Sequence, residues 1–397
     1  MKEALKKNGA FKAQLEQVLK PIENSIGLPN EFYTDQELFA FERDEVIAKE
    51  WAAISFVSDL KTPGYVKPVN FMGLPLVIVR DNEDQIKVFH NVCSHRGMKL
   101  VHEEGQSPGV MICPYHAWTY NLDGDLKGTP HIGGVDKHTD ERFKCENHGL
   151  RQVRSFVWFG IVFINLSGDA PEFLDAIAPL TERWAEFLGP QGMDQWVEAG
   201  DCHHELTVNS NWKLAVDNYC EAYHLPWVHP ALNSYSKLED HYNILFADNF
   251  AGQGSYVYNL AAVAGISLPT VQDWPKDKLQ FAEYVALFPN VLLGIQADHA
   301  FAMILDPIDA NTTIEHLRLF YVDEESAAGE KYAGNRAEVL KSWQVVFAED
   351  VDAVEGMQVG RNSPAYQGGA FSPELDQPTH YFHKWNARRY LDALSNL

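Results

Sequence analysis

Residues 91–100 read NVCSHRGMKL, and residues 111–120 read MICPYHAWTY. Each stretch holds one cysteine and one histidine, Cys93 with His95 and Cys113 with His116, and seventeen residues separate His95 from Cys113. Thiolate and imidazole groups bind zinc or iron–sulfur clusters, and four such groups on two short arms can close a single site. The two stretches therefore predict one metal centre in the first third of the chain.

The division of the ligands between the two arms bears on which metal is bound. Zinc fingers usually place two cysteines on one arm and two histidines on the other, whereas each arm of this chain supplies one of each. That division suits a [2Fe–2S] centre in which one iron takes both thiolates and the other takes both imidazoles, the Rieske arrangement. Zinc, and four separate structural residues, are the alternatives.

The sequence around the two arms favours a β scaffold. Residues 75–81 (PLVIVRD), 86–92 (IKVFHNV) and 117–128 (AWTYNLDGDLKG) are apolar or alternating and are punctuated by Asp-Asn and Asp-Gly turns. We therefore expect the ligand loops at the tips of hairpins. The apolar run FVWFGIVFI at 156–164 is about half the length that spans a bilayer, and it predicts a buried strand.

Length and composition limit the classes of protein that fit. The 397 residues leave room for two cores, and a formal charge of −23 disfavours nucleic acid and anionic membranes as partners. The N-terminus lacks the apolar core of a signal peptide, and five widely spaced cysteines do not resemble a disulfide framework. We expect a cytoplasmic protein.

Residues 211–230, NWKLAVDNYCEAYHLPWVHP, contain the pair His224 and His229, which taken alone is a weak signal of a metal site and is more often structural. Helical spacing places Asp217, Glu221 and His224 on one face of a single helix, which Pro226 then interrupts. A turn at this proline would bring His229 back toward the metal that His224 binds. If this pair binds an iron that activates O2, one carboxylate is needed as a third ligand, because two histidines and one carboxylate leave open positions on the metal.

Residues 339–360, VLKSWQVVFAEDVDAVEGMQVG, offer four acids for this role. Asp350 lies on the apolar stripe, seven residues after Trp343 and seven before Met357. An acid on a buried face is costly unless it is paired or binds metal, so Asp350 is the predicted ligand. The same helical phase directs the other three acids away from the stripe: Glu349, Asp352 and Glu355.

The pattern C-x-H-x17-C-x2-H, with SHRG and CPYHAW around it, resembles the Rieske centre of the Rieske non-haem iron oxygenases, terminal (alpha) subunit. This resemblance implies a mononuclear iron held by His224, His229 and Asp350. It also implies that Glu221 links His116 of a neighbouring subunit to His224 in electron transfer. Most ring-hydroxylating members have aspartate at that place, and glutamate resembles the branch that oxidises carnitine, choline, glycine betaine and proline betaine. Asn218 and Asp217 are expected to add hydrogen bonds around the iron.

The resemblance implies an α+β architecture that covers nearly the whole chain. We expect an N-terminal helical segment (1–45) packed on the catalytic domain, a Rieske β-sandwich (46–166) and a helix-grip catalytic domain (167–397). Its curved antiparallel sheet would include residues 284–296, 300–308 and 314–323.

The function implied is that of the terminal oxygenase in a two-component system. The expected substrate is a small quaternary ammonium or N-methylated compound. It would react with O2 at the iron of a homotrimer. No G-x-G-x-x-G follows a strand, so NAD(P)H and flavin would belong to a separate flavin or ferredoxin reductase. The alternatives are hydroxylation of an aromatic acid, a Rieske-type electron carrier without oxygenase activity, and a zinc hydrolase that uses the H-x4-H pair.

Overall fold

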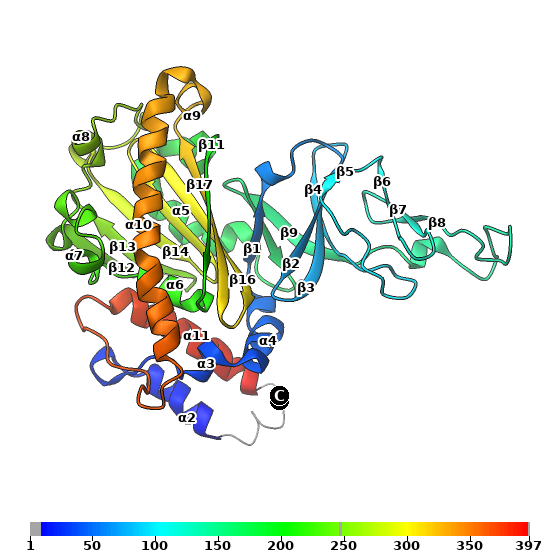
Figure 1. Cartoon of the computed structure of the whole chain (residues 1–397), viewed down its shortest axis with the longest axis horizontal. Helices are drawn as coiled ribbons and strands as arrows, with labels where there is room; N and C mark the ends of the chain where they lie inside the picture. Colours follow the sequence, from blue (N-terminus) through cyan, green and yellow to red (C-terminus); the bar gives the residue numbers. More distant parts are fainter. Residues whose placement is uncertain (1–8, 246–247, 396–397) are drawn as a thin grey trace. The chain divides into compact units, whose positions relative to one another are not determined.

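The structure is a computed structural model that describes residues 9–245 and 248–395. The chain divides into two compact units, one of residues 53–170 and one built from the residues before 53 and after 170. Figure 1 shows helices gathered around a large sheet in the second unit, whereas strands and loops dominate the first. We refer to the first as the Rieske unit and to the second as the catalytic unit, after the domains that the sequence resemblance leads us to expect there.

The Rieske unit is built from two antiparallel sheets. The larger has the order β1-β10-β9-β4-β3-β2-β5, and the smaller has the order β6-β7-β8. Their strands are β1 (Ala52–Phe56), β2 (Tyr65–Phe71), β3 (Leu74–Arg80), β4 (Ile86–His90), β5 (Gly105–Gln106), β6 (Val110–Ile112), β7 (Thr119–Asn121), β8 (Leu126–Gly128), β9 (Gln152–Trp158) and β10 (Ile161–Asn165).

The apolar run at 156–164 is not one strand as the sequence predicted. It contains the end of β9, a turn at Phe159 and Gly160, and most of β10, which pairs antiparallel with β9. Both turn residues have positive φ, 50° at Phe159 and 68° at Gly160, as a two-residue hairpin turn with the natural strand twist requires. The uninterrupted hydrophobicity hid the turn, and Gly160 was its only signal.

The catalytic unit is organised around one seven-stranded antiparallel sheet with the order β11-β17-β16-β15-β14-β13-β12. The expected curved antiparallel sheet is therefore confirmed. Residues 284–296, expected as a single strand region, form a hairpin of two strands. The strands are β11 (Val197–Val208), β12 (His241–Leu245), β13 (Phe250–Ser255), β14 (Ala282–Leu287), β15 (Val291–Gln296), β16 (Ala300–Asp309) and β17 (Thr312–Tyr321).

Helices cover both faces of this sheet. The long helix α10 crosses one face, and α6 packs between α10 and the strands (Figure 1). On the other face, Trp184 of α5 donates a hydrogen bond to Glu283 of β14 at 2.9 Å. The helices are α2 (Gly9–Val18), α3 (Glu31–Thr34), α4 (Gln36–Glu45), α5 (Phe173–Leu188), α6 (Trp212–Tyr219), α7 (Leu225–Val228), α8 (Leu260–Ala264), α9 (Glu324–Ala328), α10 (Ala333–Gly360) and α11 (Gln377–Ser395).

The N-terminal helices attach to the rest of the catalytic unit through buried polar contacts. The Lys213 ammonium of α6 lies 2.8 Å from the Glu42 carboxylate of α4, and both side chains are fully or almost fully buried. Tyr390 of α11 donates a hydrogen bond of 2.5 Å to the same carboxylate. Removing one member of such a group leaves an uncompensated buried charge, so these contacts fix α4 against α6 and α11.

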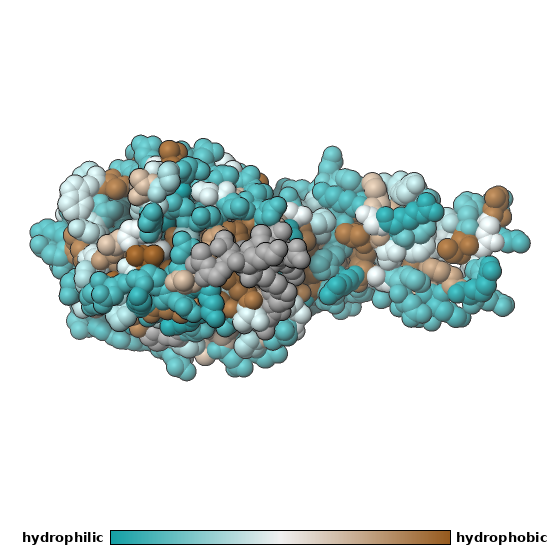
Figure 2. All heavy atoms as spheres, turned by 90° about the horizontal axis from the view of Figure 1, so that it is seen from below, coloured by the Kyte–Doolittle hydropathy of each residue, from teal (hydrophilic) through white to brown (hydrophobic). Residues whose placement is uncertain are grey.

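One face of the molecule is mostly polar. Figure 2 shows one face on which hydrophilic side chains predominate and apolar side chains form small separate patches. Within the described residues, no helix is both long enough and apolar enough to cross a membrane.

Candidate metal centres

The two predicted cluster loops have the same backbone geometry. In each loop the cysteine N–H donates to the carbonyl five residues later, from Cys93 to Met98 and from Cys113 to Trp118, both at 2.8 Å. Each cysteine carbonyl accepts from the N–H four residues later at 3.0 Å, that of Gly97 in one loop and Ala117 in the other. Two loops with different histidine spacing therefore present their cysteines in the same way.

The position that closes each loop has left-handed backbone geometry. Its φ is 73° at Gly97 and 54° at Ala117. Glycine adopts this conformation freely, whereas a residue with a Cβ atom costs about 1–3 kcal/mol there. The strain at Ala117 is tolerated because the two backbone hydrogen bonds of the loop hold it in place.

The four side chains of these loops meet in the way a Rieske cluster requires. Cys93 and Cys113 are buried, and their thiols are close enough to interact. The imidazole rings of His95 and His116 lie 4.6 Å apart, and the His95 ring stacks on Trp118. Both histidine Nδ1 atoms are buried without a hydrogen-bond partner among the described residues. Two orphaned nitrogens beside two buried thiols fit the ligand set of a [2Fe–2S] cluster.

Tyr120 lies directly against one of these cysteines. Its hydroxyl is 3.2 Å from Cys93 Sγ, and it accepts a hydrogen bond from the Ser94 backbone N–H at 3.1 Å. The Ser94 hydroxyl donates to the His148 carbonyl at 2.7 Å and lies 2.9 Å from the Tyr120 hydroxyl. The Tyr120 proton therefore has two acceptors, Ser94 Oγ and the Cys93 sulfur, and the sulfur is the stronger one when the cysteine is a thiolate, because a charged acceptor strengthens a hydrogen bond. Burial raises the pKa of Tyr120 to about 12, so it remains a donor at neutral pH.

The helix that carries the second site is shorter than the sequence predicted. The expectation that Asp217, Glu221 and His224 share one helix face is wrong, because α6 ends at Tyr219 and both Glu221 and His224 follow in the connecting turns. Pro226 does not interrupt a helix. It occupies the first turn of α7, where a missing N–H costs nothing.

The three predicted ligands of the second site lie together. One possible ligand atom from each of His224, His229 and Asp350 falls within 4.8 Å of the others, as in a metal site. An Asp350 oxygen is 2.9 Å from His229 Nε2 and 3.7 Å from His224 Nε2. Asp350 comes from α10 and the histidines flank α7, so α10 and the loop after α6 build the site together.

Both histidines are held from behind by carboxylates. Glu221 lies 2.6 Å from His224 Nδ1, and Glu349 lies 2.8 Å from His229 Nδ1. A carboxylate at Nδ1 fixes the proton there and leaves the Nε2 lone pair free for a metal. The two Nε2 atoms are the ones that face Asp350, so the donor set fits a mononuclear iron.

Glu349 is the residue of this site that sequence reasoning missed. Helical phase directed it away from the apolar stripe, and the structure contradicts that expectation. The expectation for Asp217 is also wrong. Its carboxylate accepts from Tyr33 at 3.1 Å and lies 3.0 Å from His383 Nε2, so it joins the N-terminal segment to α11 instead of contacting the iron ligands. Asn218, by contrast, lines the pocket beside Asp350.

The three ligands open into a pocket of about 50 Å³, which we call the inner pocket. Its walls on the sheet and helix side are aromatic, with Tyr219, Tyr284, Trp343 and Phe347 among the lining residues. A second small cavity of about 20 Å³ shares Asp350 with the inner pocket and is lined by Glu315. Burial and the charge of Asp350 raise the pKa of Glu315 to about 8.

Comparison with known proteins assigns these two centres to a family. Residues 193–392 match the family of the ring-hydroxylating alpha subunit, catalytic domain, and residues 50–139 match the Rieske [2Fe–2S] domain. The chain belongs to the ring-hydroxylating alpha-subunit family. It is a Rieske oxygenase, with a Rieske cluster and a mononuclear iron as its cofactors.

Several relatives carry names that state a quaternary ammonium substrate. The chain is 27% identical to the carnitine monooxygenase oxygenase subunit of Escherichia coli (strain K12), a match that covers 86% of each chain. It is 26% identical to the glycine betaine monooxygenase oxygenase subunit of Chromohalobacter salexigens, over 95% of this chain and 88% of that one. Choline monooxygenase of Arabidopsis thaliana is 26% identical, over 91% and 82% of the two chains.

Solved structures of this family share the fold. A quaternary ammonium Rieske monooxygenase, studied for carnitine oxidation and inter-subunit electron transfer, superposes with a TM-score of 0.74 at 25% identity. That match covers 94% of this chain and 98% of the other. Naphthalene 1,2-dioxygenase with bound indole superposes with a TM-score of 0.70 at 18% identity, over 95% of each chain. The α+β fold class is thereby confirmed.

Proposed function

We propose that this oxygenase oxidises a small quaternary ammonium or N-methylated compound. The observation that carries the proposal is the inner pocket, where aromatic rings stand beside the three metal ligands. A trimethylammonium group accepts no hydrogen bond, and ring faces bind it at about 0.5–2 kcal/mol each. The names of the relatives, which concern carnitine, glycine betaine and choline, point to the same substrate class.

Cys93, His95, Cys113 and His116 would hold the Rieske cluster, and His224, His229 and Asp350 would hold the iron. When bound, the cluster passes electrons one at a time and the iron activates O2. The first set lies within residues 46–166, which we assign to electron storage, and the second within 167–397, which we assign to catalysis. The protein's own residues orient the ligands, because Glu221 and Glu349 set the histidine tautomers.

The overall reaction inserts one oxygen atom into a C–H bond. One O2, two electrons and two protons are consumed, and water carries away the second oxygen. Hydroxylation of an N-methyl group gives a hemiaminal that breaks into formaldehyde and a tertiary amine. Hydroxylation of the chain carbon next to nitrogen releases trimethylamine instead.

We also propose the partners that this chemistry requires. A separate flavin or ferredoxin reductase supplies the electrons from NAD(P)H. The working unit is a homotrimer in which Glu221 joins His224 to His116 of the neighbouring subunit. The 2.6 Å contact between Glu221 and His224 supports the half of this link that lies within one chain.

The test is a turnover assay with the purified oxygenase, a surrogate reductase and NADH. Quaternary ammonium compounds should stimulate O2 and NADH consumption and yield formaldehyde or a free amine in a 1:1 ratio to O2. Stoichiometric hydroxylation of a benzoate-like acid, with no response to any ammonium compound, would favour the aromatic alternative.

A further inference from the structure

Two pockets on the same face of the catalytic sheet share an aromatic wall. The inner pocket has about 50 Å³, and a neighbouring pocket, which we call the outer pocket, has about 310 Å³. Tyr258 lines the outer pocket, and its ring lies 6.0 Å from Trp343 and 6.5 Å from Tyr284, which line the inner one. Helix α10 borders both, with Val339 at the outer pocket and Asp350 at the inner pocket, roughly 16 Å apart along the helix.

The size of the inner pocket limits what can bind beside the metal ligands. A volume of 50 Å³ holds roughly four water-sized groups. That is the number of heavy atoms in a nitrogen with three methyl groups. The remainder of a longer substrate therefore lies outside the inner pocket, and the outer pocket is the neighbouring space across the wall that Tyr258 and Trp343 form.

Neither pocket offers a cation for the tail of such a substrate. None of the described residues that line the inner or the outer pocket is lysine or arginine. The outer pocket instead contains Asp298, whose carboxylate lies 2.7 Å from His299 Nδ1. His299 Nε2 accepts a hydrogen bond from Trp343 at 3.1 Å, so the proton sits on Nδ1 and the ring is a neutral donor to Asp298.

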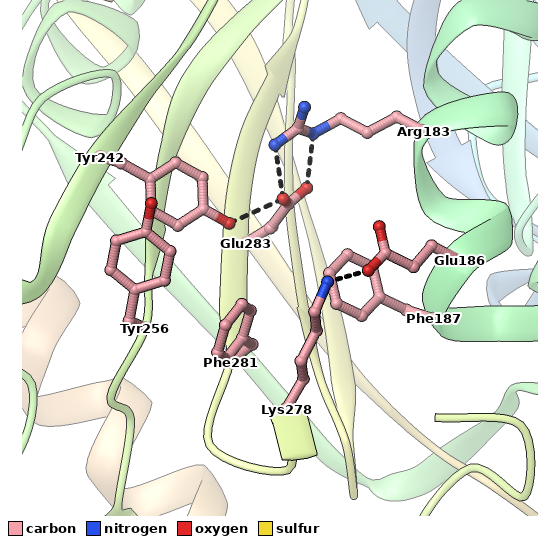
Figure 3. A pocket seen from close by; sticks show the side chains of 8 residues that line it. All are labelled: Arg183, Glu186, Phe187, Tyr242, Tyr256, Lys278, Phe281 and Glu283. Carbon is pink, nitrogen blue, oxygen red and sulfur yellow. Dashed lines mark hydrogen bonds and ion pairs between the residues drawn. The ribbon is translucent and has the colours of Figure 1, made fainter. Parts of the chain in front are cut away.

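Two cations on segments near this part of the sheet, Arg183 and Lys278, line another pocket. Figure 3 shows them in a pocket of about 450 Å³ that has Glu283 of β14 on its wall and adjoins the outer pocket at Phe281. Glu283 and Tyr284 are successive residues of one strand, so they point to opposite faces of the sheet. Both cations are paired there, Arg183 with Glu283 at 2.6 Å and Lys278 with Glu186.

The outer pocket does contain a neutral group with unused hydrogen-bonding capacity. The Gln296 amide is 2% exposed, and neither its oxygen nor its nitrogen makes a well-formed hydrogen bond within residues 9–245 and 248–395. Gln296 pairs across the strands with Ala282, which lies on the Tyr284 face of β14. Its polar neighbour toward the inner pocket is the Tyr284 hydroxyl. A buried amide whose oxygen and nitrogen lack well-formed hydrogen bonds loses stability unless a ligand or water satisfies it.

Given the proposed function, we infer that the substrate is a quaternary ammonium cation with a neutral, hydrogen-bonding tail rather than a carboxylate. The ammonium binds among the rings of the inner pocket, and the Gln296 amide binds a hydroxyl-type tail. This selects an alcohol of the choline kind over a zwitterion of the betaine kind. A carboxylate in the same place would lose its hydration and meet Asp298 without a cation to pair with.

The charge of the iron does not reverse this preference. A ferrous ion brings two positive charges, and Asp350, Glu221 and Glu349 bring three negative charges to its immediate surroundings. The potential that a substrate tail meets is therefore not positive, and a cationic ligand with an uncharged tail is favoured.

Equilibrium binding tests the inference without relying on turnover. Choline and glycine betaine carry the same trimethylammonium group and differ in ending in a hydroxyl or a carboxylate. Calorimetry on the anaerobic holoenzyme should give a dissociation constant at least about tenfold lower for choline. Equal or tighter binding of glycine betaine or carnitine overturns the inference and leaves the proposed function standing. Binding of none of these compounds, together with no turnover, overturns both.

The role of Gln296 is tested by removing the amide at nearly constant volume. Gln296→Met should weaken choline binding about three- to tenfold, the range for one lost hydrogen bond. Tetramethylammonium has no tail, so its dissociation constant in the same variant should stay within twofold of the value for the unsubstituted protein. Unchanged binding of this ligand also shows that the inner pocket is intact. An equal loss for both ligands would show that Gln296 acts only on the fold of the pocket.

Adding a cation to the outer pocket should shift the selectivity. Gln280 lines this pocket and is exposed, so Gln280→Lys should improve glycine betaine binding on the order of threefold relative to choline. Gln272→Lys, an exposed position of the same segment that does not line the pocket, is the matched control. Equal effects of the two lysines would contradict an electrostatic origin of the selectivity.

Discussion

The Nδ1 atom of His229 lies 2.8 Å from a carboxylate oxygen of Glu349. His229 is 2% exposed, so water does not reach its ring freely, and the Glu349 carboxylate accepts the Nδ1 proton and fixes it there. Glu349 immediately precedes Asp350, which means that two successive residues of α10 contact opposite nitrogens of one imidazole ring. Helix α10 thus supplies both a proposed iron ligand and the group that orients another.

Glu349→Ala should weaken iron binding at the mononuclear site by roughly 10–100-fold, the usual effect of losing an outer hydrogen bond to a metal-bound histidine. Glu349→Gln, whose amide oxygen still accepts the Nδ1 proton, should restore most of the affinity. Iron content after dialysis against a graded chelator measures the effect. Glu338→Ala, at an exposed position of the same helix, serves as the control, and iron retention by Glu349→Ala equal to that of the control would exclude this role.

Asp350→Ala should lose the mononuclear iron and all turnover while keeping the Rieske absorption and its paramagnetic resonance signal. The reason is that Asp350 is the one carboxylate within 4.8 Å of both histidine nitrogens among the described residues. Asp352→Ala, two positions later and exposed, should keep both metals and at least about half of the activity. The opposite result for the two variants would assign the ligand to Asp352.

The sequence predicts the ligands well because their signals are local. Each Rieske arm places its cysteine and histidine within four residues, so no long-range information is needed. Asp350 follows from helical phase, since a single acid interrupts an otherwise apolar stripe. Glu349 is 100° away on the same helix, and its longer side chain reaches around to His229. Phase describes where a Cβ atom points and not how far a flexible side chain extends.

The errors in the fold arise where tertiary contacts override a periodic pattern. Residues 212–224 continue a helical spacing that α6 abandons at Tyr219, and Glu221 is then free to bind the His224 ring as well as its backbone N–H. In the apolar run at 156–164 the pattern fails in another way. Both arms of the hairpin are hydrophobic, so nothing in the hydropathy marks the turn between them. The sequence marks neither the end of α6 nor the turn in the apolar run by anything more than the single glycine of that turn, Gly160.

Tyr120→Phe should lower the reduction potential of the Rieske cluster by about 20–65 mV. The lost hydrogen bond to Cys93 contributes roughly 0.5–1.5 kcal/mol and favours the more negative, reduced cluster. Spectroelectrochemistry of the purified variant measures the shift. Tyr115→Phe removes a hydroxyl from a ring that is 57% exposed and should leave the potential within about 10 mV. An unchanged potential in Tyr120→Phe would show that the hydroxyl bonds to Ser94 instead.

His380 should make the catalytic unit sensitive to acid. Burial lowers the pKa of His380 to about 4, against 6.5 for the ordinary side chain, so the folded state holds it neutral. Its contribution to stability is fully present above pH 6.5 and is lost as the pH falls toward 4, at up to about 1.4 kcal/mol per pH unit. His380→Gln keeps a donor for the Val18 carbonyl and should flatten this dependence in chemical unfolding between pH 4.5 and 6.5. His102→Gln, an exposed histidine, should leave the slope unchanged.

Glu221 and its neighbours should join subunits as well as orient a ligand. Tyr223 and Trp227, two and six residues after Glu221, are 44% and 71% exposed, and their ring centroids lie 5.9 Å apart. Exposed aromatic pairs of this kind anchor protein interfaces when they become buried. Trp227→Ala should therefore shift the proposed homotrimer toward monomers in light scattering, whereas Val359→Ala, at a 72% exposed position of α10, should not. A monomer with full activity would contradict the ring arrangement.

Glu221→Gln separates the two roles of this residue, because the amide oxygen still accepts the His224 proton but the negative charge is gone. Both metals should remain bound, and electron transfer from the cluster to the iron should slow by at least about tenfold, equivalent to some 1.4 kcal/mol for replacing a charge-assisted hydrogen bond by a neutral one. Single-turnover mixing of the reduced enzyme with O2 and substrate measures this rate through the return of the oxidised Rieske absorption. A normal rate in the intact trimer would mean that electrons pass between His116 and His224 without Glu221, and its 2.6 Å contact with His224 would then serve the iron ligand alone.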